Sequence, residues 1–126
     1  MPPADLMLAI DTQLSHVWMV RAFLKHSDEA AEDEELAEVH RELYDYMLAL
    51  GGPLKEQNAA EYLRLARKKF SKLQRATEQF AEIQPQISQH TNFFMAAASL
   101  KAGQIVTKPY HYGPLIRKID GLLAAA

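Results

Sequence analysis

The sequence predicts an all-α protein, an up-down-up-down four-helix bundle with an extended connector and a short C-terminal helix. Between residues 59 and 80 the core positions alternate spacings of four and three, as in a helix that packs one narrow stripe against other helices. The stripe consists of Ala59, Leu63, Ala66, Phe70, Leu73, Thr77 and Phe80. Glycine and proline separate the periodic segments. A length of 126 residues fits one domain, residues 1–126.

The first helix is expected over residues 3–26, with two apolar faces. The main face carries Leu6, Ile10, Leu14, Val17 and Leu24, and the second carries Leu8, Met19 and Phe23. A bundle of this size normally covers one face of a helix, so the second face predicts either a central position in the bundle or a subunit contact. Arg21 lies within the main apolar sector, and we expect it to be buried with carboxylate or carbonyl partners.

The second helix is expected over residues 28–50. Ser27 or Asp28 can cap it, and the carboxylates of its first turns complement the positive end of the helix dipole. Its core stripe is Leu36, Val39, Leu43, Tyr46, Met47 and Leu50. Gly51 and Gly52 are expected to end it.

The third helix is expected over residues 53–84. It can start at Pro53 as a first-turn proline, or at Asn58, whose spacing to Glu61 is that of a capping box, and we favour Pro53. Pro85 is expected to break or kink the chain after this helix.

The fourth helix is expected over residues 86–102. Its core face is assigned to Ile87, Thr91, Phe94, Ala97 and Ala98. An extended connector over 104–112 follows, because β-branched residues and a proline succeed one another there. A short terminal helix over 114–124 is then expected to pack back on the bundle.

Composition excludes several functional classes. The chain has no cysteine, so disulfides, thiolate nucleophiles and thiolate metal sites are ruled out. A net charge of -2 gives no bulk attraction to nucleic acid or anionic membranes. No apolar run reaches the ~20 residues that span a bilayer, and the first residues do not resemble a secretion signal. We therefore expect a cytoplasmic protein without membrane contact.

Three histidines on three predicted helices offer a metal site as an alternative function. The candidate ligands are His16, His40, His90 and Asp45. Each histidine lies about 60 to 80 degrees from the centre of its apolar stripe, where imidazoles from different helices could meet and hold Zn or Fe. The inward-facing His and Glu pairs of di-iron bundles are absent from the sequence. A boundary histidine that packs and hydrogen-bonds to water is the more common case.

Two charged stripes lie opposite the predicted core faces. The basic stripe of the third helix is Arg64, Lys68, Lys72 and Arg75, and the acidic stripe of the second is Glu35, Glu38, Glu42 and Asp45. Because each points away from its own core, we expect them not to pair fully within one monomer, although flanking members can, and to suit a second copy or a partner. Nucleic acid is an unlikely partner, since no aromatic side chains interleave the basic stripe.

These observations favour a non-catalytic helical bundle that acts through self-association or protein–protein interaction, without a cofactor. The candidate partner-binding residues are Leu8, Met19, Phe23, Tyr110, His111, Tyr112, Arg64, Lys68, Lys72 and Arg75. The three from 110 to 112 form an aromatic, irregular segment of the kind that often hosts contacts. The metal-binding bundle, which could be an enzyme, is the alternative. A third possibility is a small-ligand pocket lined by Trp18, Tyr44, Tyr46, Phe93 and Phe94.

Overall fold

The computed structural model describes residues 2–103 and 121, and this part of the chain is helical, without a strand. The helices are α1 (Pro3–Gln13), α2 (Ser15–Lys25), α3 (Asp28–Glu32), α4 (Glu34–Lys55), α5 (Ala59–Ile87) and α6 (Thr91–Gly103). The all-α class is therefore confirmed. None of the helices described is long and apolar enough to cross a membrane. The expected connector over 104–112 and helix over 114–124 lie outside the described residues.

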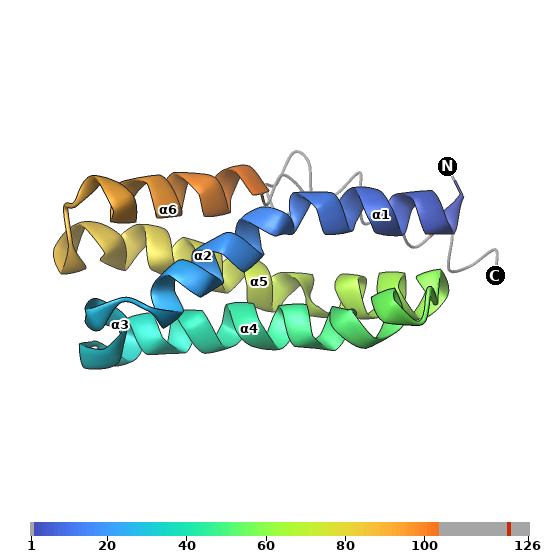
Figure 1. Ribbon diagram of the computed structural model, residues 1–126, viewed down its shortest axis with the longest axis horizontal. Helices are drawn as coiled ribbons and strands as arrows, with labels where there is room; N and C mark the ends of the chain where they lie inside the picture. Colours follow the sequence, from blue (N-terminus) through green and yellow to red (C-terminus); the bar gives the residue numbers. More distant parts are fainter. Residues whose placement is uncertain (1, 104–120, 122–126) are drawn as a thin grey trace.

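The long helices lie side by side and alternate in direction (Figure 1). α4 and α5 pack against each other along their length, α2 contacts α4 and α6, and α6 contacts α5. α1 continues α2 along the top of the view and packs on α5, while α3 forms a short turn at the opposite end of the molecule from the N-terminus. This arrangement brings the apolar stripes of all the long helices together.

The expected first helix over 3–26 is bent at Leu14, which separates α1 from α2. Leu14 is fully buried and has φ -71° and ψ -6°. The hydroxyls of Thr12 and Ser15 donate to backbone carbonyls one turn earlier, at 2.9 and 2.7 Å. Such side-chain bonds to the backbone bend helices, which explains why the single helix was wrong.

The expected second helix over 28–50 is divided into α3 and α4. Ser27 caps α3 as expected, because its hydroxyl accepts the N–H of Ala30 at 3.1 Å. Asp33 has extended backbone angles and caps α4, with its carboxylate accepting the N–H of Leu36 at 2.9 Å. A second strong cap within the acidic segment therefore starts a new helix.

Gly51 and Gly52 do not end the helix, as the sequence suggested, but lie inside α4 together with Pro53. No glycine in the described residues has a positive φ, so these two do not supply a left-handed turn. The left-handed residue is Gln57, with φ 56°. The prediction that the two glycines end the helix was therefore wrong, because α4 ends about one turn later.

α4 ends in a Schellman motif. The N–H of Gln57 donates to the carbonyl of Leu54 at 3.1 Å, and the N–H of Asn58 donates to the carbonyl of Pro53 at 2.8 Å. The Asn58 side chain then accepts the N–H of Glu61 at 3.2 Å and caps α5. The start at Asn58 is therefore correct, and the start at Pro53 that the sequence favoured is wrong.

The boundary between α5 and α6 also differs from the expected ranges 53–84 and 86–102. Pro85 lies within the last turn of α5, which ends before Ser88, where the backbone becomes extended. The buried Gln84 side chain donates to the Ser88 carbonyl at 2.8 Å and secures this end. The helix passes the proline because only its final turn is affected.

The core confirms the stripe of α5, in which Leu63, Ala66, Phe70, Leu73, Thr77 and Phe80 are all buried. The buried face of α6 differs from the expected one and consists of Phe93, Ala96, Ala97 and Leu100. Phe94 is instead exposed. The buried Tyr62 hydroxyl donates to the Asp11 carboxylate at 3.2 Å and ties α5 to α1. Burial and the nearby Asp11 charge raise the pKa of Tyr62.

Candidate association surface

The side chains considered for a metal do not form one cluster. His16 Nδ1 lies 2.9 Å from the Ser99 hydroxyl of α6, whereas His90 is exposed and its Nδ1 accepts a backbone N–H two residues later, at 3.0 Å. Asp45 is exposed on α4. Within residues 2–103 and 121, no group of three or more His, Asp or Glu side chains is arranged to hold a metal ion. The geometry therefore gives no support to the metal hypothesis.

Arg21 of α2 is 7% exposed, so its expected burial is confirmed. Its guanidinium carbon lies 4.1 Å from the Trp18 ring centroid and 5.5 Å from that of Tyr44. Its Nε is buried without a hydrogen-bond partner. The expected carboxylate or carbonyl contact was wrong, because two aromatic faces hold the guanidinium instead.

His40 lies beside this aromatic pair and stacks on Tyr44, with ring centroids 6.5 Å apart. Its Nε2 is also buried without a hydrogen-bond partner. Burial first, and then the charges of Arg21, Lys25 and Arg41, lower the pKa of His40. The junction of α2 and α4 is therefore a locally cationic site that favours a neutral imidazole.

Large apolar side chains are exposed along the same junction. Trp18 projects from α2, and Tyr44 and Leu48 lie one turn apart on α4. A hollow of about 360 Å³ lies beside Trp18, between it and the α4 residues Met47 and Leu54. We call Trp18, Tyr44, Leu48 and this hollow the α2–α4 surface.

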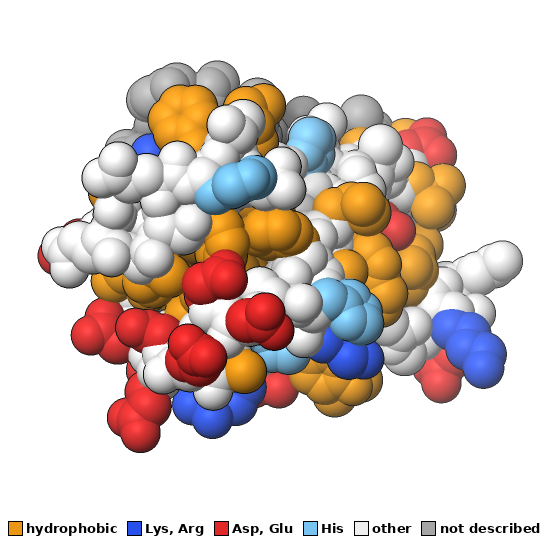
Figure 2. All heavy atoms as spheres, turned by 60° about the vertical axis from the view of Figure 1, so that its left-hand side comes forward, with side chains coloured by type: hydrophobic (Ala, Val, Ile, Leu, Met, Phe, Trp, Pro, Cys, Tyr) orange, Lys and Arg blue, Asp and Glu red, His pale blue; other side chains and the backbone are white. Residues whose placement is uncertain are grey.

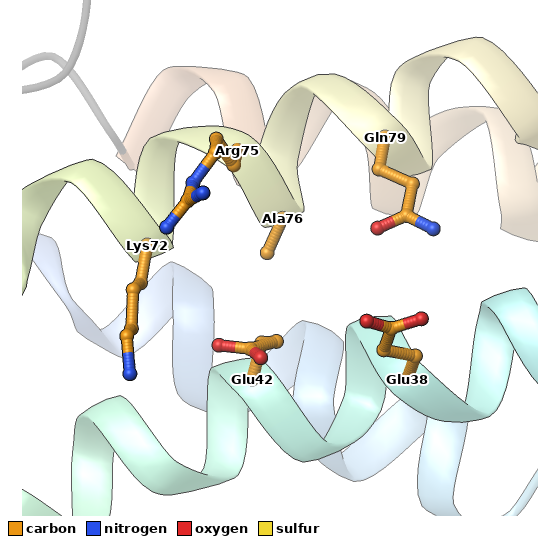
Figure 3. Close-up of a pocket in the computed structure, with 6 residues that line it drawn as sticks. All are labelled: Glu38, Glu42, Lys72, Arg75, Ala76 and Gln79. Atoms are coloured by element: carbon orange, nitrogen blue, oxygen red, sulfur yellow. The ribbon is translucent and has the colours of Figure 1, made fainter.

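A second hollow of about 270 Å³ lies between α4 and α5 and is charged. Figure 3 shows Glu38 and Gln79 pointing toward one another across it, with Lys72 and Arg75 on the Glu42 side. Flanking members of the acidic and basic stripes therefore line one groove within the molecule. Long, flexible charged side chains line this groove, and such exposed groups contribute little to stability.

No family model, curated protein or solved structure matches the chain. Its function must therefore be argued from the geometry of its own residues.

The other predicted partner-binding residues differ in their exposure in the structure. Leu8 and Met19 are exposed, as expected for a contact face. Phe23 is half-buried and packs edge to face on Phe93 of α6, which removes it from that face. The aromatic segment Tyr110, His111 and Tyr112 lies outside the described residues.

The members of the basic stripe of α5 also have different surroundings. Arg64 pairs with Glu61 one turn earlier on the same helix, with its Nε 2.8 Å from the carboxylate. Lys68 is exposed, and Lys72 and Arg75 line the α4–α5 groove. All four members of the stripe are exposed on α5, and its role in partner binding stays a prediction. The acidic side chains, in contrast, gather at the end of the molecule that carries α3 (Figure 2).

Sequence reasoning missed the α2–α4 surface because it assigned Tyr44 to a possible pocket and did not single out Leu48. The signal was present as the four-residue spacing of these two apolar residues on the side of the helix away from its core stripe.

Proposed function

We propose that the protein acts by association, with a second copy of itself as the partner that the observations favour, and that it has no catalytic role. The exposure of the α2–α4 surface carries this proposal: Trp18, Tyr44 and Leu48 are 48%, 41% and 62% exposed. Single exposed apolar residues are common on proteins, but neighbouring ones beside a hollow are typical of interaction sites.

The chemistry of this surface also suits a protein partner. Tryptophan and tyrosine are enriched at the centres of interfaces, where they bury a large area at a small cost in side-chain entropy. Burial of apolar surface contributes about 25 cal/mol per Å², so covering these side chains would supply a substantial driving force. Arg21 holds Trp18 and Tyr44 in place before any partner arrives.

The proposed architecture is an up-down-up-down four-helix bundle, in which α2, α4, α5 and α6 are the four members and α1 extends the first. Short connections and alternating helix directions support it (Figure 1). In such a bundle, every helix has an outer face that is free for contact. We do not propose a metal-binding function, because no described geometry favours it.

Light scattering during size-exclusion chromatography tests the proposal. We expect the purified chain to approach twice its mass of 14.2 kDa as its concentration rises. A constant mass of 14.2 kDa at every concentration would contradict self-association.

A further inference from the structure

The outward face of α4 carries a second stripe with alternating spacings of three and four. Its members are Glu34, Ala37, Arg41, Tyr44, Leu48, Gly51 and Lys55. All are exposed except Ala37, which is half-buried. The stripe continues through the whole helix, about 33 Å at 1.5 Å per residue. This spacing is that of a seam between paired helices, and here nothing within the described residues covers it.

The two glycines of this helix are not required by its own backbone or by the other described residues. Neither Gly51 nor Gly52 has a positive φ, and a Cβ added to either would meet no described atom within 4 Å. Each costs about 0.5 to 1 kcal/mol of helix stability relative to alanine. Glycine has no Cβ, so it would allow the backbone of another molecule to approach closely at this point.

The charges of the stripe specify an orientation. Glu34 lies at its first end and Lys55 at its last, so two parallel copies would place like charges together. An antiparallel pair with its twofold axis between positions 44 and 45 sets Glu34 opposite the partner's Lys55. The same register sets Ala37 opposite the partner's Gly52, which allows the helices to come close. The stripe is thus complementary to itself in one direction only.

We infer that a second copy of the chain covers the α2–α4 surface by packing its α4 antiparallel against α4, with Tyr44 and Leu48 at the centre. The inference rests on the proposed self-association and specifies where and in which direction it occurs. On each copy, Trp18 and the central Tyr44 contact the same Arg21 guanidinium. Opposed helix dipoles add a favourable contribution to this orientation.

Engineered cysteines test the orientation, because the natural chain contains no cysteine and an introduced thiol has no competitor. Glu34→Cys and Lys55→Cys are made as separate variants, then mixed and oxidised. We expect disulfide-linked dimers from the mixture and little product from either variant alone, since a disulfide requires Cα atoms about 4.4 to 6.8 Å apart. Efficient linkage of Glu34→Cys to itself would show a parallel pair and overturn the inference. Ser71→Cys, exposed on α5, is the control that reports random collision.

Leu48→Glu tests the position of the interface. We expect it to give a monomer in light scattering with an unchanged circular dichroism spectrum, because Leu48 is 62% exposed and its loss leaves the monomer core intact. The matched control is Met95→Glu on α6, where the replaced side chain is 56% exposed and lies outside the stripe. This control should retain the natural mass.

The two proposals fail in different ways. A natural chain that stays monomeric at all concentrations contradicts self-association itself. A natural chain that dimerises while Leu48→Glu also dimerises, or while the mixed cysteine variants fail to link, contradicts only the antiparallel α4 interface.

Discussion

Phe23 illustrates how a single contact decides the role of a side chain. On α2 it points toward α6, where its ring meets that of Phe93 at 5.0 Å between centroids and at 70° between planes. This edge-to-face geometry is the favourable one for aromatic pairs. Met19 on the same helix is 64% exposed, so two residues that the sequence placed on one face have different environments.

A charge should therefore be tolerated at one position and not at the other. We expect Phe23→Asp to lower the free energy of unfolding by about 2 to 4 kcal/mol, since it removes a packed ring and places a carboxylate in an apolar contact. Met19→Asp should change it by no more than about 0.5 kcal/mol. Urea unfolding followed by circular dichroism measures both. Equal effects of the two substitutions would contradict the assignment of Phe23 to the α2–α6 contact.

His40 makes stability depend on pH. Its pKa in the folded protein is lowered from 6.5 by burial and by nearby cations, so the unfolded chain takes up a proton more readily as the pH falls through 6.5. Its contribution to stability is therefore complete above pH 6.5, declines below it, and stops declining once the pH passes the lowered pKa of the folded protein.

The matched variant is His40→Phe, which keeps a ring over Tyr44 but cannot titrate. Urea midpoints measured above and below pH 6.5 should fall more for the natural protein than for this variant. The difference between the two isolates His40 from the carboxylates that also titrate in acid. Parallel curves for both proteins would show that His40 is not held neutral.

Among the helices, the C-terminal end of α4 differs most from what its residue types predict. A Gly-Gly-Pro sequence usually ends a helix, yet here the helix continues through it for two further residues. Schellman hydrogen bonds around Gln57 satisfy the last carbonyls one turn later. The tertiary packing of Leu50 and Leu54 against the core compensates for the weak local propensity.

Replacing the glycines distinguishes their effect on helix stability from their proposed role in the close approach of a second copy. At concentrations where the protein is monomeric, Gly51→Ala and Gly52→Ala should each raise the free energy of unfolding by about 0.5 to 1 kcal/mol, because no atom of the described residues opposes the new methyl group. In light scattering the same variants should dimerise less readily. Ser71→Ala is the control, with a gain in helix propensity and an unchanged mass. Tighter dimerisation of the glycine variants would contradict close approach at this point.

The sequence predicted elements well wherever hydrophobic periodicity decided them. The stripe of α5 and the core positions Leu36, Val39 and Leu43 of α4 are buried as expected. Boundaries were predicted poorly, because glycine and proline report local preference while caps such as Asp33 and Asn58 compete for the same backbone. A side chain near the edge of a stripe, such as Phe94, was misplaced because a small rotation of the helix changes its exposure.

At the scale of the molecule, the helical class could be predicted, but the meeting of charged stripes in the α4–α5 groove could not. Helical spacing places Glu42 and Lys72 opposite their own cores, yet it does not say how far each helix rotates when the two pack. The partners of Arg21 were equally out of reach, since aromatic rings and carboxylates both satisfy a guanidinium.

Self-association would also link stability to concentration. Only folded chains can form the dimer, so a higher protein concentration favours the folded state. The urea midpoint of the natural protein should therefore rise as the protein is concentrated. Leu48→Glu should show one midpoint at every concentration. A natural protein that has dimer mass but whose midpoint does not change with concentration would contradict a dimer that dissociates as its chains unfold.

The acidic turn formed by α3 and the start of α4 gives the described part of the molecule an uneven distribution of charge that the small net charge conceals. The carboxylates Asp28, Glu29, Glu32, Asp33, Glu34 and Glu35 occupy one end, while Arg64, Arg67, Lys68 and Lys69 belong to the first half of α5, nearer the other. If the protein self-associates as proposed, two such molecules should turn head to tail before their surfaces touch. Added salt should therefore slow the encounter of two copies far more than it hastens their separation.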